Sequence, residues 1–269
     1  MSKNKAFLQD ESMGIALVTG ASMGIGLELA REHAKRGGDL ILVARSGGLL
    51  KEVKSEFERA YKVRVYVIEK DLLQACAVQE LYQEVKDKGL QVEYLINNAG
   101  FGNYGFFSDT PLKTDEDMIG LNITVLTQLC KMFLRDMLQQ KRGAILNVAS
   151  LAAFQAGPTM AVYFASKAYV LSFSEALSNE LKGKDVSVTA LCPGPTQSNF
   201  SNRANLLNSP LFNRNIDSAE FVAKVGYTGM IKGRRVVIPG LKNKILAFAS
   251  QIAPRHWATA ISRKMQEIK

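Results

Sequence analysis

Short apolar segments alternate with amphipathic segments along most of the chain. The apolar segments predict strands at about 14–19, 39–44, 63–69, 94–97, 143–148, 185–191 and 235–238. The amphipathic segments predict helices at about 24–36, 46–60, 76–88, 115–140, 159–182 and 218–232. Strands that alternate with helices form parallel sheets covered on both faces. We therefore expect an α/β fold, a doubly wound parallel sheet of about seven strands.

Two segments interrupt this alternation. Residues 193–216 are polar and contain three prolines, and loops of this length usually act as lids or binding segments. The second segment is the tail that follows residue 239. We expect a single domain at residues 1–240, with a binding loop at 193–216, and a C-terminal amphipathic helical extension at 241–269.

The tail carries apolar residues at helical spacing, with basic residues beside them. They form two stripes: Ile245, Leu246, Phe248, Ala249 and Ile252, then Trp257, Ala260, Ile261 and Met265. One interpretation is a basic amphipathic anchor that lies weakly on a membrane surface. The other, which we favour, is packing on the chain's own domain or on a partner subunit, because an apolar stripe more often packs into a core.

A glycine-rich turn follows the first predicted strand. Gly20, Gly24 and Gly26 in GASMGIG precede the amphipathic segment LELAREHAKR. A strand, a glycine turn and a helix are typical of a phosphate-binding loop, because glycine lets the backbone approach closely and the helix start offers N–H groups. The spacing G-x3-G-x-G differs from the commonest dinucleotide fingerprint, so a plain strand-to-helix turn is the alternative.

Tyr163 and Lys167 in YFASK lie on one face of a predicted helix. An ammonium beside a phenol favours the phenolate and lowers the pKa of the tyrosine, which prepares it to exchange a proton with a carbonyl or alcohol oxygen. Ser150 ends the predicted strand AILNVAS, where its hydroxyl could hold the same oxygen. By itself this tyrosine–lysine spacing is also that of a common surface pair.

Seven motifs in order give a more specific picture. They are TGASMGIG at 19–26, Asp71-Leu72, NNAG at 97–100, Asn122 in GLNIT, Ser150 after NVA, YFASK at 163–167 and PGPT at 193–196. Taken together, they resemble the short-chain dehydrogenase/reductase family over roughly residues 13–238. The resemblance implies a Rossmann-type fold, and a hydride transfer between a nicotinamide cofactor and a carbonyl carbon. The branch it resembles is related to the 3-ketoacyl and hydroxysteroid reductases.

The resemblance also implies roles for individual residues. Tyr163 would donate the proton, Lys167 would lower its pKa and hold the nicotinamide ribose, and Ser150 would bind the substrate oxygen. Asn122 would bend its helix and help to hold a water that resupplies protons to Lys167. The cofactor would contact Gly20, Ser22, Met23, Gly24, Ile25, Gly26, Asp71, Leu72, Asn98, Ala99, Gly100, Tyr163, Lys167, Pro193, Gly194 and Thr196.

The residue that follows the second predicted strand indicates whether the chain prefers NADP(H) or NAD(H). Asp39 has the spacing of a ribose-binding acid, but it begins this strand, and ligands bind at the carboxyl ends. Arg45 stands at the carboxyl end, where a guanidinium suits a phosphate dianion. We therefore predict NADP(H) rather than NAD(H). The alternative is that Arg45 only points to solvent.

The substrate is less well determined. Largely apolar residues surround the predicted pocket: Phe101, Tyr104, Phe106, Phe107, Ala152, Phe154, Phe200, Leu206, Leu207, Leu211 and Phe212. They suggest a small-molecule substrate such as a hydrophobic ketone or a 3-oxoacyl group, although each could equally pack in the core. An NADP(H)-binding peripheral membrane or scaffold protein with little turnover is the alternative function.

Composition limits the remaining choices. The chain has 269 residues, 47% of them hydrophobic, and neither a signal peptide nor a membrane-spanning segment is expected. The net charge is +9, but the basic residues are dispersed, so no nucleic-acid partner is expected. Cys76, Cys130 and Cys192 fit small core residues rather than disulfides or a metal site, which favours a reducing, cytoplasmic location. His33 falls on a polar helix face and is predicted to lie at the surface.

We also expect a homo-oligomer, a dimer or tetramer. In the family that the chain resembles, the helices that carry the Asn122 and Tyr163 motifs usually pack across subunits. The second of these helices presents small residues on one face, at Ala161, Ala165, Ala168 and Ser172. Small residues at this spacing allow helices to approach closely. The tail could instead cover this face and leave a monomer.

Overall fold

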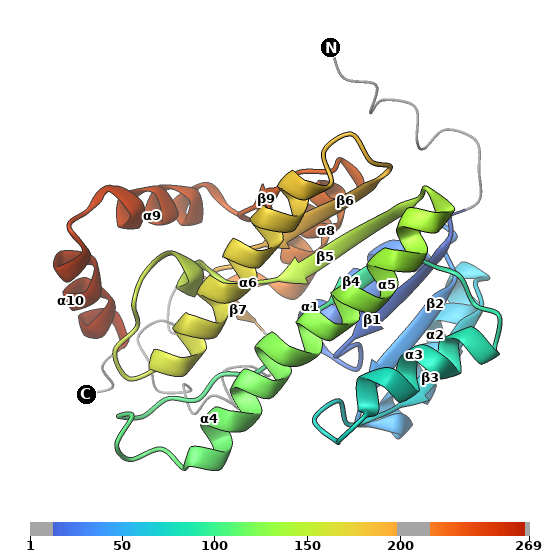
Figure 1. Ribbon diagram of the computed structural model, residues 1–269, viewed down its shortest axis with the longest axis horizontal. Helices are drawn as coiled ribbons and strands as arrows, with labels where there is room; N and C mark the ends of the chain where they lie inside the picture. Colours follow the sequence, from blue (N-terminus) through green and yellow to red (C-terminus); the bar gives the residue numbers. More distant parts are fainter. Residues whose placement is uncertain (1–12, 198–215, 267–269) are drawn as a thin grey trace.

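The computed structural model describes residues 13–197 and 216–266. Its centre is a parallel sheet with the strand order β3-β2-β1-β4-β5-β6-β9 (Figure 1). The strands are β1 (Ile15–Thr19), β2 (Leu40–Ala44), β3 (Val65–Glu69), β4 (Val92–Asn97), β5 (Gly143–Val148), β6 (Val186–Leu191) and β9 (Val236–Val237). The chain winds outward from β1 to β3 and then, from β4, in the opposite direction. This confirms the predicted doubly wound, Rossmann-type sheet.

Helices cover both faces of the sheet, as the alternation of segments predicted. One face carries α1 (Gly24–Ala34), α2 (Gly47–Tyr61) and α8 (Ala219–Ile231). The other carries α3 (Ala77–Asp87), α5 (Leu126–Gln140) and α6 (Ala161–Glu180). The short 3₁₀ helix η2 (Leu151–Phe154) follows β5. Two short strands, β7 (Thr196–Gln197) and β8 (Asp217–Ser218), pair in parallel and join the ends of the segment predicted as the substrate loop.

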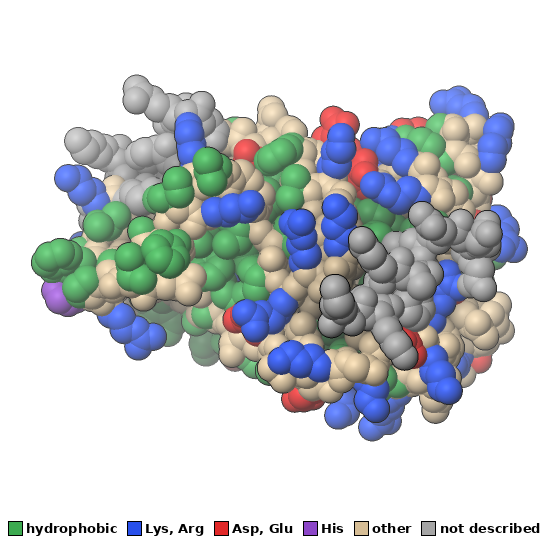
Figure 2. All heavy atoms as spheres, turned by 90° about the horizontal axis from the view of Figure 1, so that it is seen from above, with side chains coloured by type: hydrophobic (Ala, Val, Ile, Leu, Met, Phe, Trp, Pro, Cys, Tyr) green, Lys and Arg blue, Asp and Glu red, His purple; other side chains and the backbone are tan. Residues whose placement is uncertain are grey.

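The tail forms two helices at one end of the molecule, α9 (Leu241–Ile252) and α10 (Arg255–Gln266) (Figure 1). Among the side chains of the tail that the structure describes, the buried ones are small or polar: Ala247, Ala258, Ser262 and Gln266. Most of its large apolar side chains face solvent, and Figure 2 shows hydrophobic and basic side chains together at this end. The tail therefore contacts its own domain, but the first predicted stripe is largely exposed in the single chain, so its packing on a partner subunit or on a membrane surface stays a prediction.

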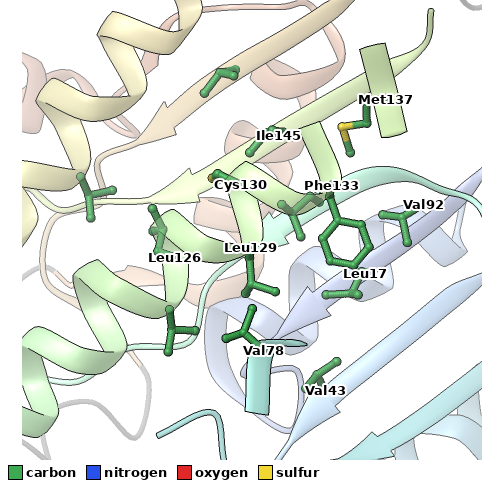
Figure 3. Close-up of a cluster of buried hydrophobic side chains, with 14 of the residues drawn as sticks. Leu17, Val43, Val78, Val92, Leu126, Leu129, Cys130, Phe133, Met137 and Ile145 are labelled. Atoms are coloured by element: carbon green, nitrogen blue, oxygen red, sulfur yellow. The ribbon is translucent and has the colours of Figure 1, made fainter. Parts of the chain in front are cut away.

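The sheet is buried on both faces because successive side chains of a strand point to opposite sides. In β1, Leu17 joins the cluster under α3, α5 and α6, whereas Ala16 and Val18 join the cluster under α1, α2 and α8. Figure 3 shows the first cluster, in which Phe133 and Leu129 of α5 meet the sheet. Cys130 and Cys192 are buried core residues as predicted, but Cys76 is exposed.

The predicted helix at 115–140 is interrupted. It consists of α4 (Leu112–Ile119), a π-helical segment η1 (Gly120–Val125) and α5. Asn122 lies in the π segment, so the predicted local distortion is present. Its side chain donates to the Phe101 carbonyl (2.9 Å) and the Ser166 hydroxyl (3.0 Å) and accepts from the Phe101 amide (3.1 Å). π-Helical turns are rare and often accompany functional sites.

His33 is fully buried, so the predicted surface position is wrong. Its Nδ1 lies 2.7 Å from the Tyr227 hydroxyl of α8, and its Nε2 lies 2.8 Å from the Gly14 carbonyl oxygen. Because α8 covers this face of α1, a position that reads as polar in the sequence lies inside. Burial lowers the pKa of His33 to about 4, because the charged imidazolium loses its hydration.

This burial predicts a pH dependence of stability. The unfolded histidine titrates near its ordinary pKa of about 6.5 and the folded one near 4, so between these values the unfolded chain binds more protons. The contribution of His33 to the free energy of unfolding is complete above pH ~6.5. It falls by up to about 3 kcal/mol as the pH drops toward ~4. Urea unfolding of the wild type and His33→Gln at several pH values tests this. We expect the wild type to lose more stability with acid than the variant, and parallel losses would contradict the prediction.

Candidate functional site

One pocket of about 970 Å³ lies at the carboxyl ends of the strands. It begins at the glycine turn after β1, crosses the point between β1 and β4 where the strand order reverses, and reaches α9 and α10. In doubly wound sheets ligands bind at this reversal, because the loops there diverge and leave a crevice. The pocket is of the size that encloses cofactors and drug-sized ligands.

The glycine turn is a compact backbone loop. Gly20 and Gly24 have φ values of 64° and 60°, in the left-handed region that favours glycine. Asn98 braces the turn, because its Nδ2 donates to the carbonyls of Thr19 (3.0 Å) and Gly20 (3.2 Å). The first turn of α1 contains no acidic residue and its start has no side-chain cap. The backbone N–H groups at the start of α1 are therefore suited to bind an anion such as a phosphate.

Basic side chains line the part of the pocket that lies beyond β2 and β3. Arg45 lines the pocket and is exposed, and Ser46 and Lys70 line it beside Arg45. The Lys70 ammonium also pairs with Glu80 at 2.8 Å. Asp39 lies at the opposite end of β2, where its carboxylate binds the Arg64 side chain at 2.7 Å. The sequence analysis thus identified Arg45 and rejected Asp39 on the position that the structure shows, but it missed Lys70 as a second cation.

Three polar side chains meet at the reactive end of the pocket. Ser150 follows β5 and accepts a hydrogen bond from the Ala152 amide (3.1 Å). Tyr163 lies in the first turn of α6 and is hydrogen-bonded to Ser150. Lys167 follows one turn later, and its Nζ donates to the Val148 carbonyl (2.8 Å) and lies 5.9 Å from the centre of the Tyr163 ring. The structure therefore brings together the three residues that the sequence places on separate elements.

Burial dominates the acidity of this group. It raises the pKa of Tyr163 to about 12, and the hydrogen bond to Ser150 offsets part of this rise. Burial lowers the pKa of Lys167 to about 8. The prediction that the Lys167 ammonium lowers the pKa of Tyr163 is therefore wrong for this structure. The ammonium lies 5.9 Å from the centre of the ring, and desolvation is the largest cause of the pKa shift of each group.

Gly100 lies against the side chains of Asn122 and Lys167. A Cβ atom on this residue would stand 2.8 Å from the Asn122 Oδ1 and 3.5 Å from the Lys167 Nζ. Only glycine allows the loop after β4 to pass this closely. Asn122 itself does not line the pocket, and its hydrogen bonds hold Phe101 and Ser166 in place. Asn122 therefore supports the residues of the site without lining the pocket itself.

Most of the predicted cofactor residues line the pocket. Those that do are Gly20, Ser22, Met23, Gly24, Ile25, Arg45, Asp71, Leu72, Asn98, Ala99, Gly100, Tyr163, Lys167, Pro193, Gly194 and Thr196. Gly26 does not, because it packs behind the turn, where a Cβ would lie 2.3 Å from the Gly20 carbonyl oxygen. Their contacts with a cofactor remain predictions.

The wall of the substrate region differs from the prediction. Phe101 and Ala152 line the pocket, whereas Tyr104 and Phe154 pack in hydrophobic clusters, and Phe106 and Phe107 are exposed. Phe200, Leu206, Leu207, Leu211 and Phe212 lie outside the described residues. The tail supplies a wall that we had not assigned to the pocket: Lys242, Asn243, Leu246, Ala247, Ala249, Ser250, Ala253, Ala258, Ile261, Ser262 and Gln266.

The tail is also attached to the loops of the site. The Asn243 side chain donates to the Asp217 carboxylate (3.0 Å) and to the Pro239 carbonyl (2.8 Å), and it lies against Gly194. At the end of α10, the Gln266 amide donates to the Ser262 hydroxyl (2.8 Å), and both are buried. Spacing in the sequence shows the two helices, but it gives no sign that they fold back over the site.

Comparison with known proteins agrees with this geometry. The sequence model of the family described as short chain dehydrogenase matches residues 14–207. A very-long-chain 3-oxoacyl-CoA reductase of Anas platyrhynchos is 32% identical over 80% of this chain and 69% of its own length. The 17-beta-hydroxysteroid dehydrogenase type 3 of Homo sapiens is 35% identical over 70% of this chain and 61% of its own. The chain thus spans about two thirds of the length of these relatives.

Solved structures show the same architecture. A short-chain dehydrogenase from Sphingobium yanoikuyae in complex with NADPH superposes with a TM-score of 0.80 and 29% sequence identity. The match covers 89% of this chain and 94% of that one, so it includes most of the described sheet and helices.

Proposed function

Since this chain belongs to the short-chain dehydrogenase/reductase family, whose members are NAD(P)-dependent oxidoreductases, we propose that it uses NADPH to reduce a hydrophobic ketone or a 3-oxoacyl group. The observation that carries the proposal is the grouping of Ser150 with the buried Tyr163 and Lys167 at the end of one pocket. A scaffold function without turnover gives no reason for a buried lysine beside a buried tyrosine, since burial of both groups costs stability.

Four side chains of the chain have roles in this reduction. Ser150 donates a hydrogen bond to the substrate oxygen as negative charge develops on it. Tyr163 gives its proton to that oxygen, and a phenol whose pKa is raised by burial begins the reaction in the protonated form that reduction requires. Lys167, with a pKa near 8, exchanges protons readily close to neutral pH. Asn122 holds the loop at Phe101 in place.

The pocket suits NADP(H). The glycine turn and the start of α1 fit a pyrophosphate, and the boundary of Arg45, Ser46 and Lys70 fits a 2′-phosphate. The neighbour from Sphingobium yanoikuyae is in complex with NADPH. When bound, the nicotinamide supplies the hydride, and the chain orients it and holds the substrate oxygen.

The side chains that line the pocket indicate the class of substrate. Leu151, Met160, Phe164 and Leu246 are apolar, and together with the small Ala258 they leave room for a long or bulky group. The relatives named above act, by their names, on very-long-chain 3-oxoacyl-CoA, which carries a ketone on a long apolar chain, and on 17-beta-hydroxysteroids, which carry the corresponding alcohol on a bulky apolar frame. Oxidation of the corresponding alcohol is the reverse of the same reaction.

The test is NADPH oxidation across a panel of matched ketones. We expect higher kcat/KM for long-chain 3-oxoacyl thioesters or steroid ketones than for short ketones and sugars. Absence of turnover with every member, from protein that binds NADPH, would overturn the proposal and favour the scaffold alternative. Turnover confined to small polar ketones would overturn the substrate class.

We also propose a cytoplasmic location and a homo-oligomer. Two buried thiols, Cys130 and Cys192, suit a reducing compartment. The predicted interface on α6 is accessible, because Ala161, Ala165 and Ser172 are exposed. The weak membrane association of the tail is a further proposal, developed below from its exposed face.

The interface on α6 gives a testable prediction. We expect Ala165→Arg to shift the wild-type dimer or tetramer toward a monomer in light scattering of dilute protein, because a large charged side chain separates two closely packed helices. Ala60→Arg is a matched control, since Ala60 is exposed at the end of α2. A monomeric wild type would contradict the oligomer, and an unchanged Ala165→Arg oligomer would contradict the interface.

A further inference from the structure

We propose that the outer face of α9 and α10 docks onto the surface of an anionic lipid bilayer, and that the substrate pocket opens toward this surface. The first half rests on the tail alone. The second half rests on the proposed function, since it concerns the route by which an apolar ketone reaches Tyr163.

The apolar residues on the outer face of α9 form one continuous line. Leu241, Ile245, Phe248 and Ile252 are spaced four, three and four apart, which places them on one side of a helix, and they are 72%, 59%, 65% and 69% exposed. Trp257 and Ile261 add a second exposed line on α10. Folded soluble proteins seldom leave this much apolar surface uncovered on adjacent helices unless something binds there.

The same helices carry basic but no acidic residues. Between 241 and 266 the chain contains Lys242, Lys244, Arg255, Arg263 and Lys264 and no Asp or Glu. Lys244 lies beside the outer line of α9 and Lys264 beside Trp257 and Ile261 on α10, as their helical spacing requires. An apolar line edged by cations matches the boundary between acyl chains and anionic headgroups.

Charge also decides between a bilayer and a second copy of the chain. A symmetric dimer through this face would bring Lys244 and Lys264 of both copies together, and residues 241–266 contain no Asp or Glu. A bilayer that contains acidic phospholipids supplies the opposite charge and an apolar layer at once. No helix in the described ranges is long and apolar enough to cross a membrane.

The pocket reaches the edge of this face, because Ile261 belongs to the exposed line of α10 and also lines the pocket. Leu246 and Ile261 both line the pocket, and they are 51% and 59% exposed. The apolar lining of the pocket therefore continues outward into the apolar surface of the tail. An apolar ketone dissolved in a bilayer could enter the site along this path without crossing water, and Figure 2 shows how the hydrophobic side chains gather at this end.

The first experiment is flotation of the full chain with vesicles of equal parts phosphatidylglycerol and phosphatidylcholine, and with vesicles of phosphatidylcholine alone. We expect binding to the anionic vesicles that weakens with added salt. The variant Leu241→Ser/Ile245→Ser/Phe248→Ser/Ile252→Ser should bind about tenfold less or weaker still, because the inserted apolar area is gone. Lys244→Gln/Arg255→Gln/Lys264→Gln should also bind less and lose most of the salt dependence.

The matched control is Phe106→Ser/Phe107→Ser/Leu112→Ser, which removes exposed apolar side chains from another segment. We expect it to float like the wild type. Equal loss in the control and the tail variant would overturn the proposal, because it would show only general adhesion. Loss of self-association in the tail variant, with no flotation of the wild type, would identify a second copy as the occupant and would also overturn it.

Activity separates this proposal from the proposed function. None of the four residues replaced in the tail variant lines the pocket, so turnover of a water-soluble ketone should be unchanged. Turnover of a bilayer-dissolved ketone should fall in parallel with flotation. Flotation without turnover of either ketone would contradict the proposed function and leave the docking face intact. Flotation with equal use of both ketones in wild type and variant would overturn the entry route.

Discussion

Replacement of Tyr163 by phenylalanine is expected to lower kcat by about 10²–10⁴-fold, the usual contribution of a positioned general acid. The ring and its packing against Phe164 remain, and only the hydroxyl that meets Ser150 is lost. NADPH affinity should change little, because Lys167 and the glycine turn are untouched. Single-turnover kinetics and fluorescence titration of NADPH measure the two effects separately.

Tyr169→Phe is the control for this prediction. Tyr169 lies on the same helix, is 37% exposed, and its hydroxyl lies 3.0 Å from Thr127 rather than near the site. It should retain wild-type turnover. If Tyr163→Phe kept more than a few per cent of the wild-type rate, Tyr163 would not be the acid.

Replacement of Arg45 by alanine is expected to weaken NADPH binding by about 1.5–3 kcal/mol, the range for a hydrogen bond to a charged group. This is a loss of about ten- to hundredfold in affinity. NADH binding should change much less, since NADH lacks the 2′-phosphate. Lys70 lies near the same end of the pocket, so a part of the affinity should survive and should fall further in Arg45→Ala/Lys70→Ala.

Titration of both cofactors against wild type, Arg45→Ala and Arg59→Ala tests the assignment. Arg59 is an exposed arginine of α2, so its replacement removes the same charge away from the boundary of the pocket. We expect Arg59→Ala to bind both cofactors as the wild type does. An equal loss of NADPH and NADH affinity in Arg45→Ala would show that this side chain does not hold the 2′-phosphate.

Much of the fold could be predicted because it depends on local patterns. β1 is an apolar segment followed by a glycine turn, and the side chains of both its faces are buried, so its identity does not depend on distant partners. The carboxyl end of each strand fixes which residues face the ligand crevice, which is why Arg45 could be separated from Asp39. The spacing of Tyr163 and Lys167 on one helix is likewise local.

The sequence alone determined the order of the elements and the glycine turn, because chain periodicity and neighbouring residues set them. The reactive residues were identified from the resemblance of seven ordered motifs to a known family. Only the tertiary structure decided that α8 buries His33 and that the tail lines the pocket with Leu246 and Ile261. It also decided that burial sets the pKa values of Tyr163 and Lys167. These outcomes depend on contacts between segments far apart in the chain, and desolvation arises only when such segments pack together.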